Sequence, residues 1–356
     1  MSQMEVCQHS GNRKASSISA RALAPAIVAA ITGILSLAGN AQTSQPLTLS
    51  RTISLGGVQG KFDHFAIDLA RNRLFAAATG NHSVEVIDLK TDKVEQSIAG
   101  LGKPHGLAWV EATGSLYVAD GTLAELRVYT GSPLALKGTI ELSDDADDMV
   151  YDAAGKTLYV GHGGDAAHPA RIAVVDAEHF TLTTNLVAAT HPEALEIDPQ
   201  SRRVFANIAD SNEVAVIDAD SRAITAHWKL TKAADNVPMA FDDAHQLLYV
   251  ACRKPGTLIA VDAASGKEVA SVASAGGADD LFYDAELRRI YLISGQGEVD
   301  AYQVDAGKEL HPLGVLHTAA GAKTALFVPS QKVLYVGVPG AGDRAAEIRV
   351  YSTNAR

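Results

Sequence analysis

The sequence predicts an all-β protein, a seven-bladed β-propeller of four-stranded blades in which the N-terminal strand completes the last blade. First, a bulky aliphatic residue followed by an aromatic one recurs seven times, and the aromatic residues are spaced by 42, 42, 46, 44, 42 and 44 residues. Repeats of about 40–45 residues with four strands each are typical of propeller blades. Second, short β-rich runs separated by turn residues fill the chain after residue 42, without helical periodicity. Third, the last copy is one strand short. The seven pairs are Leu74-Phe75, Leu116-Tyr117, Leu158-Tyr159, Val204-Phe205, Leu248-Tyr249, Ile290-Tyr291 and Leu334-Tyr335.

Composition and charge limit the class of protein. The 356 residues are 47% hydrophobic and 20% charged, a balance that excludes a disordered, collagen-like or coiled-coil chain. The 41 acidic residues exceed the 30 basic ones, which gives a net charge of −11. Because nucleic acids and anionic membranes attract basic fields, we do not expect either as a partner.

Residues 1–41 are typical of an export signal. Basic residues precede an uncharged apolar stretch at 22–38, and Gly39 and Ala41 supply the small residues that a signal peptidase requires. A membrane anchor is the alternative, but Pro25 and the shortness of the stretch disfavour it. We therefore expect a periplasmic or secreted protein without a membrane span after processing. Its propeller would occupy 42–356 as a single domain and, as a closed ring, would be a monomer.

The cysteines exclude two kinds of site. Cys7 lies in the predicted signal, so Cys252 stands alone and cannot form an intramolecular disulfide. The sequence has no C-x-x-C-H motif, so covalent haem is not expected. Cys252 follows an apolar run, which predicts a buried, unreactive thiol.

The first repeat predicts strands at 65–68, 73–78, 83–89 and 93–98, and the other six repeats follow the same register. Aspartate recurs at the turns that follow the first and third strands. Because Asp side chains cap their own backbone at turns, we assign these residues a structural role. They are Asp68, Asp88, Asp152, Asp176, Asp198, Asp218, Asp242, Asp262 and Asp284.

The two ends of the chain predict how the ring closes. The seventh repeat ends one strand early, and the segment 47–55 (LTLSRTISL) matches the missing strand. We expect this segment to pair as the outer strand of the last blade, which removes open sheet edges.

The innermost strand of a propeller blade begins near the axis, on the face that usually binds ligands; we call this end of the channel the mouth. The positions eleven and twelve residues before each aromatic mark it, and they differ from blade to blade, unlike a purely structural register. Carboxylates and imidazoles that converge there suit a hard or borderline cation, or acid–base chemistry. A network of structural turns is the alternative. With His191 just before one innermost strand, the candidates are Asp63, His64, His105, Asp147, Asp148, His191, Glu193, Asp279, Asp280 and Lys323.

Four extra residues in each of the third and seventh repeats lengthen loops that should share the mouth side. They fall within 161–171 and 340–347, between the second and third strands. Gly-rich loops on a rigid scaffold often carry function, although a plain solvent loop is the alternative. The loop candidates are His162, His168 and Arg344, and Arg253 could bind an anion at the mouth.

The stretch 205–218, FANIADSNEVAVID, closely resembles the YVTN repeat, and 117–120 and 159–162 are looser versions. The chain after residue 42 is similar to the YncE-like YVTN β-propellers over essentially its whole length. This resemblance implies a seven-bladed, exported protein, often without an assigned reaction. No blade spells YVTN in full, and the similarity to haem-bearing and quinoprotein propellers extends only to the fold.

Two functions remain open. The favoured one is a binding scaffold that captures a small ligand, a cation or a partner segment at the mouth, because no compact catalytic motif is present. The alternative is a metal-assisted hydrolase, lactonase or lyase, in which His64, His105 or His191 would move protons. Either function could use one divalent cation. Its expected ligands are Asp147, Asp148, Glu193 and Asp279.

Overall fold

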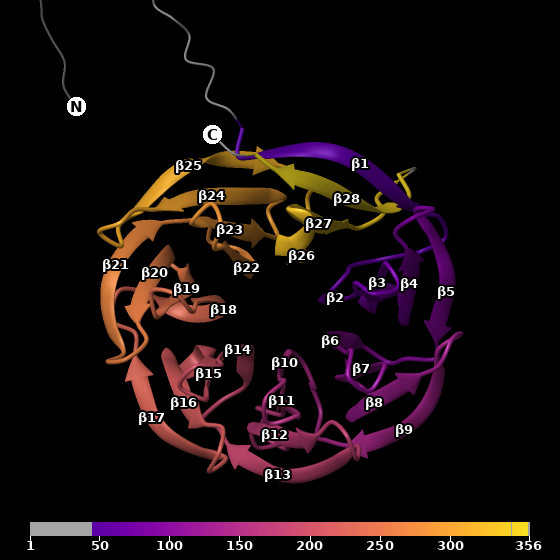
Figure 1. Ribbon diagram of the computed structural model, residues 1–356, viewed down its shortest axis with the longest axis horizontal. Coiled ribbons are helices and arrows are strands. Elements are labelled where there is room, and N and C mark those ends of the chain that lie inside the picture. Colours follow the sequence, from indigo (N-terminus) through magenta and orange to yellow (C-terminus); the bar gives the residue numbers. More distant parts are fainter. Residues whose placement is uncertain (1–44, 343, 355–356) are drawn as a thin grey trace, which may run out of the picture. The chain divides into compact units, whose positions relative to one another are not determined.

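Seven antiparallel sheets of four strands stand in a ring around a common axis (Figure 1). The computed structural model describes residues 45–342 and 344–354, so the predicted export signal lies outside the described residues. The predicted fold class and the number of blades are confirmed. In the described part of the chain no helix has the length and hydropathy needed to cross a membrane.

Each blade runs from an inner strand at the axis to an outer strand at the rim, in chain order except that β1 is the outermost strand of the seventh blade. The first three blades are β2 (Phe65–Asp68), β3 (Arg73–Ala78), β4 (Ser83–Asp88), β5 (Lys93–Ala99); β6 (Pro104–Val110), β7 (Ser115–Asp120), β8 (Glu125–Thr130), β9 (Ala135–Glu141); β10 (Met149–Asp152), β11 (Thr157–His162), β12 (Arg171–Asp176), β13 (Thr181–Val187). The next three are β14 (Pro192–Asp198), β15 (Arg203–Ile208), β16 (Glu213–Asp218), β17 (Ala223–Lys229); β18 (Ala234–Asp242), β19 (Leu247–Lys254), β20 (Gly256–Asp262), β21 (Lys267–Ala273); β22 (Ala278–Asp284), β23 (Arg289–Ser294), β24 (Glu298–Val304), β25 (Leu310–His317). The seventh is β26 (Ala325–Val328), β27 (Val333–Val338), β28 (Ala346–Thr353) and β1 (Leu47–Leu55), and single 3₁₀ turns lie at η1 (Thr79–Asn81), η2 (Ala209–Ser211) and η3 (Pro329–Gln331).

The hydrophobic core lies between the blades, because a single sheet cannot cover its own two faces. The seven repeated aromatic residues are all buried. Phe75 of the first blade packs in one cluster with Leu107 and Leu116 of the second. The buried Tyr117 hydroxyl donates to the backbone oxygen of Ala177 in the next blade at 2.9 Å, so the repeated aromatic also ties neighbouring blades together.

The N-terminal strand closes the ring as predicted. β1 pairs antiparallel with β28, from Leu47 opposite Thr353 to Leu55 opposite Ala346. Ile53 and Leu55 are fully buried in a cluster shared by the seventh and first blades. Two ends of the chain thus complete one sheet and leave its last blade paired rather than open.

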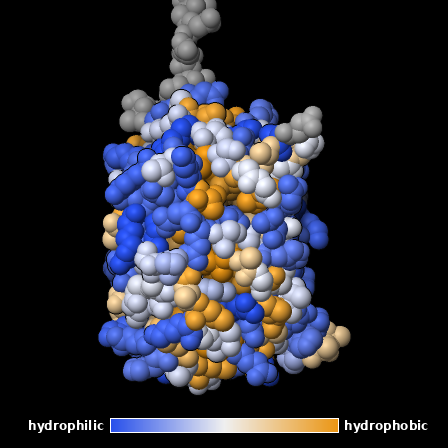
Figure 2. Space-filling view, turned by 90° about the vertical axis from the view of Figure 1, so that its right-hand side faces the viewer, coloured by the Kyte–Doolittle hydropathy of each residue, from blue (hydrophilic) through white to orange (hydrophobic). Residues whose placement is uncertain are grey.

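The outer flank of the ring mixes hydrophilic and hydrophobic residues (Figure 2). Most of the exposed large apolar side chains, such as Leu49, Leu136 and Val187, belong to outermost strands. Most residues of outermost strands such as β5, β9 and β13 are exposed or half-buried, because no further strand lies beyond them at the rim.

The turn aspartates have the structural role that their spacing predicts. Asp68 accepts the backbone N–H of Arg71 at 3.0 Å and the guanidinium of Arg73 at 2.9 Å. Asp218, on an exposed turn, accepts the N–H of Ser221 at 2.7 Å. The buried Cys252 also agrees with its prediction, since burial raises the pKa of its thiol to about 12.

Candidate functional site

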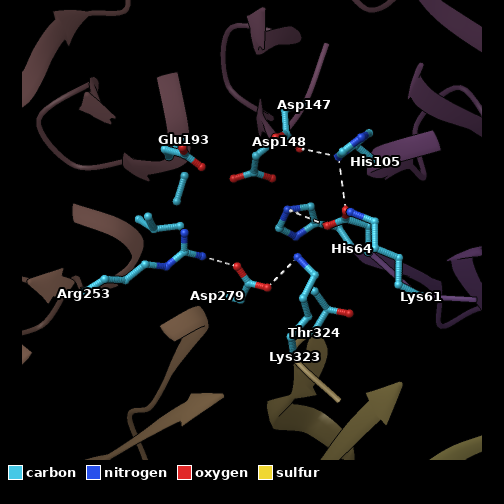
Figure 3. A pocket seen from close by; sticks show the side chains of 13 residues that line it. Lys61, His64, His105, Asp147, Asp148, Glu193, Arg253, Asp279, Lys323 and Thr324 are labelled. Carbon is cyan, nitrogen blue, oxygen red and sulfur yellow. Dashed lines mark hydrogen bonds and ion pairs between the residues drawn. The ribbon is translucent and has the colours of Figure 1, made fainter. Parts of the chain in front are cut away.

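A cavity of about 190 Å³ opens where the innermost strands begin (Figure 3). β6 and β14 bring His105 and Glu193 to it, and β22 brings Asp279. The loops that lead into β2, β10 and β26 supply most of the other charged side chains, because the repeat places the same register of every blade at the axis. Arg253 reaches the cavity from the end of β19. The charged lining residues are Lys61, Asp63, His64, His105, Asp147, Asp148, Glu193, Arg253, Asp279 and Lys323.

A row of hydrogen bonds joins three successive blades at the rim of this cavity. His105 Nδ1 lies 3.1 Å from Asp63 Oδ2 and 3.1 Å from Asp147 Oδ1. Burial alone would lower the pKa of His105, but the two carboxylates raise it to about 9. Burial would likewise raise the pKa of Asp147, yet His105 and His191 hold it well below its ordinary value. The protonated ring of His105 therefore holds Oδ1 of Asp147 in place.

His191 approaches the other oxygen of Asp147. Its Nδ1 lies 2.5 Å from the backbone oxygen of Gly163 and donates to it, which turns Nε2 toward Asp147 Oδ2 at 3.7 Å. Nε2 is buried and makes no hydrogen bond with the described residues. Gly163 belongs to the long loop of the third blade, so this loop does lie at the mouth as predicted. There it borders a second cavity of about 300 Å³ with Asp144 and Asp165.

Two carboxylates of the cavity have no cationic partner in contact. Within the described residues, Glu193 forms neither a hydrogen bond nor an ion pair, and burial together with the charge of Asp147 raises its pKa to about 7. Asp148 accepts only backbone N–H groups, that of Leu195 at 3.1 Å among them, and burial raises its pKa. Both side chains point toward the middle of the site in Figure 3.

Basic side chains occupy the opposite side of the cavity. Arg253 Nη2 and Lys323 Nζ both bind the carboxylate of Asp279, Lys323 at 2.5 Å. Burial would lower the pKa of Lys323, but the charges of Asp63 and Asp279 raise it. Lys61, which the sequence analysis did not single out, is exposed and lines the same side.

His64 stands between the mouth and the channel below it. Its Nδ1 lies 3.5 Å from Asp280 Oδ1, and its Nε2 lies 3.7 Å from Asp63 Oδ1. Burial opposes protonation, yet Asp148, Asp280 and Asp63 raise the pKa of His64 to about 10. Asp280 accepts the N–H of Ala325 at 2.7 Å, and burial raises its pKa to about 7.

A deeper cavity of about 230 Å³ continues down the channel and holds a carboxyl that sequence reasoning missed. Glu196 lies among apolar side chains such as Met149 and Leu281, and burial and the charge of Asp148 raise its pKa to about 8. A signal was present: nine residues before the aromatic, Glu196 is the one polar residue of the seven. The other six are Ala66, Ala108, Val150, Ala240, Phe282 and Leu326.

Three loop candidates lie away from the cavity. His162 is buried inside its blade, where it accepts from the Ser143 N–H at 3.1 Å and bonds Asn185 Oδ1 at 2.9 Å, and burial lowers its pKa. His168 pairs with Asp165 in the loop at 3.0 Å. Arg344 donates to the backbone oxygen of Pro339 at 3.0 Å. The fourth loop candidate, Arg253, does line the mouth.

Three groups of side chains in the described residues bring possible metal-ligand atoms within 4.8 Å of one another. In the group of Asp63, His105 and Asp147, the nitrogen of His105 that faces the carboxylates already contacts both of them, and in the group of Asp144, Asp165 and His168 the histidine is paired with Asp165. Among these three groups, only in that of His191 does the ring nitrogen that faces the carboxylate make no hydrogen bond. Asp148 and Asp279, which the sequence analysis expected as ligands, belong to none of the three, and Asp279 is bound by two basic side chains. The groups are Asp63, His105 and Asp147; Asp147, His191 and Glu193; and Asp144, Asp165 and His168.

Comparison with known proteins supports the architecture and nothing finer. No family model matches the chain, and neither does any curated protein. The chain is similar to hydrazine synthase of Kuenenia stuttgartiensis, with a TM-score of 0.70, 17% identity, and coverage of 79% of this chain and 93% of that one. It is similar also to a chain of a mitotic checkpoint complex, with a TM-score of 0.71, 14% identity, and coverage of 86% and 92%. At such identities the likeness shows the fold alone. The chain is therefore a seven-bladed β-propeller with a WD40-like fold, without assignment to the YVTN family.

Proposed function

We propose that this propeller is an exported binding protein that captures a divalent cation at its mouth through Asp147, His191 and Glu193. The observation that carries the proposal is the orientation of His191. The Nδ1–H bond to Gly163 fixes the ring, and Nε2 makes no hydrogen bond but lies 3.7 Å from a carboxylate oxygen of Asp147. Histidine ligands of metals are commonly held in this way by a backbone carbonyl.

The spacing of the donor atoms supports a metal ion. The 3.7 Å between His191 Nε2 and Asp147 Oδ2 is too long for a hydrogen bond. It is close to the ~3.4 Å that separates two ligands of a tetrahedral zinc ion. In contrast, the 3.1 Å contacts of His105 are ordinary hydrogen bonds.

The surrounding residues would support such an ion. His105, itself held by Asp63, fixes the second oxygen of Asp147, as outer partners of a metal ligand do. One imidazole and two carboxylates suit a borderline cation such as Zn²⁺ or Mn²⁺ better than Ca²⁺, which prefers oxygen alone. Glu193 gains the positive partner that it lacks.

The test is metal analysis and calorimetric titration of the processed protein, purified without chelator or affinity metal. We expect one equivalent of Zn²⁺ or Mn²⁺ to bind, and His191→Ala or Glu193→Gln to weaken binding at least tenfold. His168→Ala is the matched control, because His168 belongs to the separate loop group. Binding that survives His191→Ala but is lost in His168→Ala, or a folded ring that binds neither metal, would contradict the proposal.

A second candidate function is metal-assisted hydrolysis, lactone opening or elimination at the same site. It is favoured by the cavity that borders the ligand group, because three protein ligands leave an open coordination position for substrate or water. Screening lactones and esters with the metal-loaded protein tests it. Turnover that disappears in His191→Ala would favour an enzyme, whereas metal binding without turnover would favour capture alone.

A further inference from the structure

The charges of the mouth are segregated. Figure 3 shows the carboxylates of Asp147, Asp148 and Glu193 on one side, which we call the anionic arc. The other side carries Lys61, Arg253 and Lys323, which we call the cationic arc, with Asp279 between the last two. A ligand that completes both arcs must present a positive charge to the first and a negative charge to the second.

The cationic arc is only partly neutralised by the protein. Among the described residues, Asp279 is the one carboxylate in contact with Arg253 and Lys323, and the charge of Asp63 acts on Lys323 from a greater distance. Arg253 uses Nε for the backbone oxygen of Ala278 and Nη2 for Asp279. Within the described residues Nη1 makes no hydrogen bond, and Lys61 forms no ion pair. Donors for an anion are therefore left facing the cavity.

The way in which Asp279 is bound indicates the chemistry of that anion. One guanidinium N–H of Arg253 and the ammonium of Lys323 each donate to an oxygen of Asp279, so charged donors at this place already bind a carboxylate. The cavity of about 190 Å³ has room for on the order of six water molecules. A ligand of that size with carboxylate oxygens at one end is a small organic acid.

We propose that the mouth binds a small carboxylate, with Arg253 and Lys323 holding the acid and the cation of the anionic arc accepting one of its oxygens. That the cation accepts an oxygen of the acid rests on the proposed function. That Arg253 and Lys323 hold the acid rests on the cationic arc alone, so an experiment can contradict either claim without the other.

The test is titration of malonate into metal-loaded and metal-free protein, with metal content measured in the same samples. We expect Arg253→Gln and Lys323→Gln each to weaken malonate binding to the metal-loaded protein at least tenfold. Asp279→Asn should strengthen it severalfold, because the ligand no longer competes with an internal carboxylate. A merely structural role of Asp279 would weaken binding instead. Arg344→Gln, outside the mouth, is the matched control and should leave it unchanged.

The outcomes separate the two claims. Metal uptake without malonate binding at millimolar concentrations would overturn the carboxylate inference and leave cation capture intact. Unaltered malonate affinity in both Arg253→Gln and Lys323→Gln would overturn it too. If no metal binds, malonate binding that depends on Arg253 and Lys323 would still support the cationic arc, and its absence would overturn it.

Discussion

Acidic side chains have different roles in this protein, depending on which groups they contact. Asp68 is fully buried yet bound by a guanidinium and a backbone N–H, and it serves a turn. Glu193 has no such partner and faces a cavity. The residue type does not separate these roles. Comparison of the blades does separate them, because the turn position seven residues before the aromatic is Asp in five of the seven blades, whereas the residues at the mouth positions vary.

Glu196 offers a test of the channel electrostatics at a single residue. Burial and Asp148 raise its pKa to about 8, so the folded protein keeps its proton where the unfolded chain has lost it. Glu196 therefore costs stability increasingly as the pH rises from about 4.5 to 8, and nothing below that window. We expect Glu196→Gln to raise the free energy of unfolding at pH 8 relative to the parent protein. This stabilisation should be on the order of 1 kcal/mol larger at pH 8 than at pH 4.5.

Urea unfolding of both proteins at the two pH values measures this difference. Glu141→Gln, at an exposed strand end, is the control and should show no such dependence. A Glu196→Gln protein that is less stable than the parent at pH 8, or whose advantage does not vary with pH, would show that Glu196 is ionised in a polar channel.

The limits of sequence reasoning at this scale lie in side-chain direction. Counting back from the repeated aromatic finds Asp63, His105 and Asp147, because the register fixes which positions reach the axis. The lengthened loop of the third repeat suggested His162, but this residue ends β11 and turns into its own blade. Nor could the sequence tell that His191 would be oriented by a loop of the preceding blade, since that contact spans two repeats.

At the scale of elements, the long loop of the third blade shapes the site through its glycines. Gly164 has φ +123°, and a Cβ there would lie 2.7 Å from the Cβ of His191. We expect Gly164→Ala to displace His191 and weaken cation binding at least tenfold, measured by calorimetry. Gly342→Ala is the matched control, because Gly342 also has positive φ, in the long loop of the seventh blade, but no neighbour within 4 Å of the added Cβ. Equal cation binding by both variants would mean that the loop does not position the ligand.

The closing strand makes a second prediction at this scale. Ile53 is fully buried between blades, whereas Leu49 on the same strand is 49% exposed. We expect Ile53→Ala to cost about 2–4 kcal/mol of unfolding free energy, because it leaves a cavity in the interblade core. Leu49→Ala should change it by less than about 0.5 kcal/mol. Similar losses in thermal or urea unfolding would indicate that β1 is held by its backbone hydrogen bonds rather than by packing.

For the whole molecule, the repeat determines the fold, and the positions that break the repeat supply the residues of the proposed cation site. Seven similar units predict the ring, its closure and the axis because each blade must bury both faces against its neighbours. The fold itself is compatible with proteins as different as hydrazine synthase and a mitotic checkpoint complex, so it selects no activity. The sequence placed carboxylates and imidazoles at the mouth. The sequence could not show which of these side chains would bind one another and so be unavailable to a ligand, because that depends on distances of a few tenths of an ångström.

The most direct test of the account is to locate the cation itself. Crystals of the processed protein soaked in Zn²⁺ or Mn²⁺, with data collected at the metal's absorption edge, should show one anomalous peak within about 2.0–2.3 Å of Asp147, His191 and Glu193. A peak found only beside Asp165 and His168, or none at the mouth of a crystal that has taken up metal, would contradict the assignment of this propeller's mouth as a cation site.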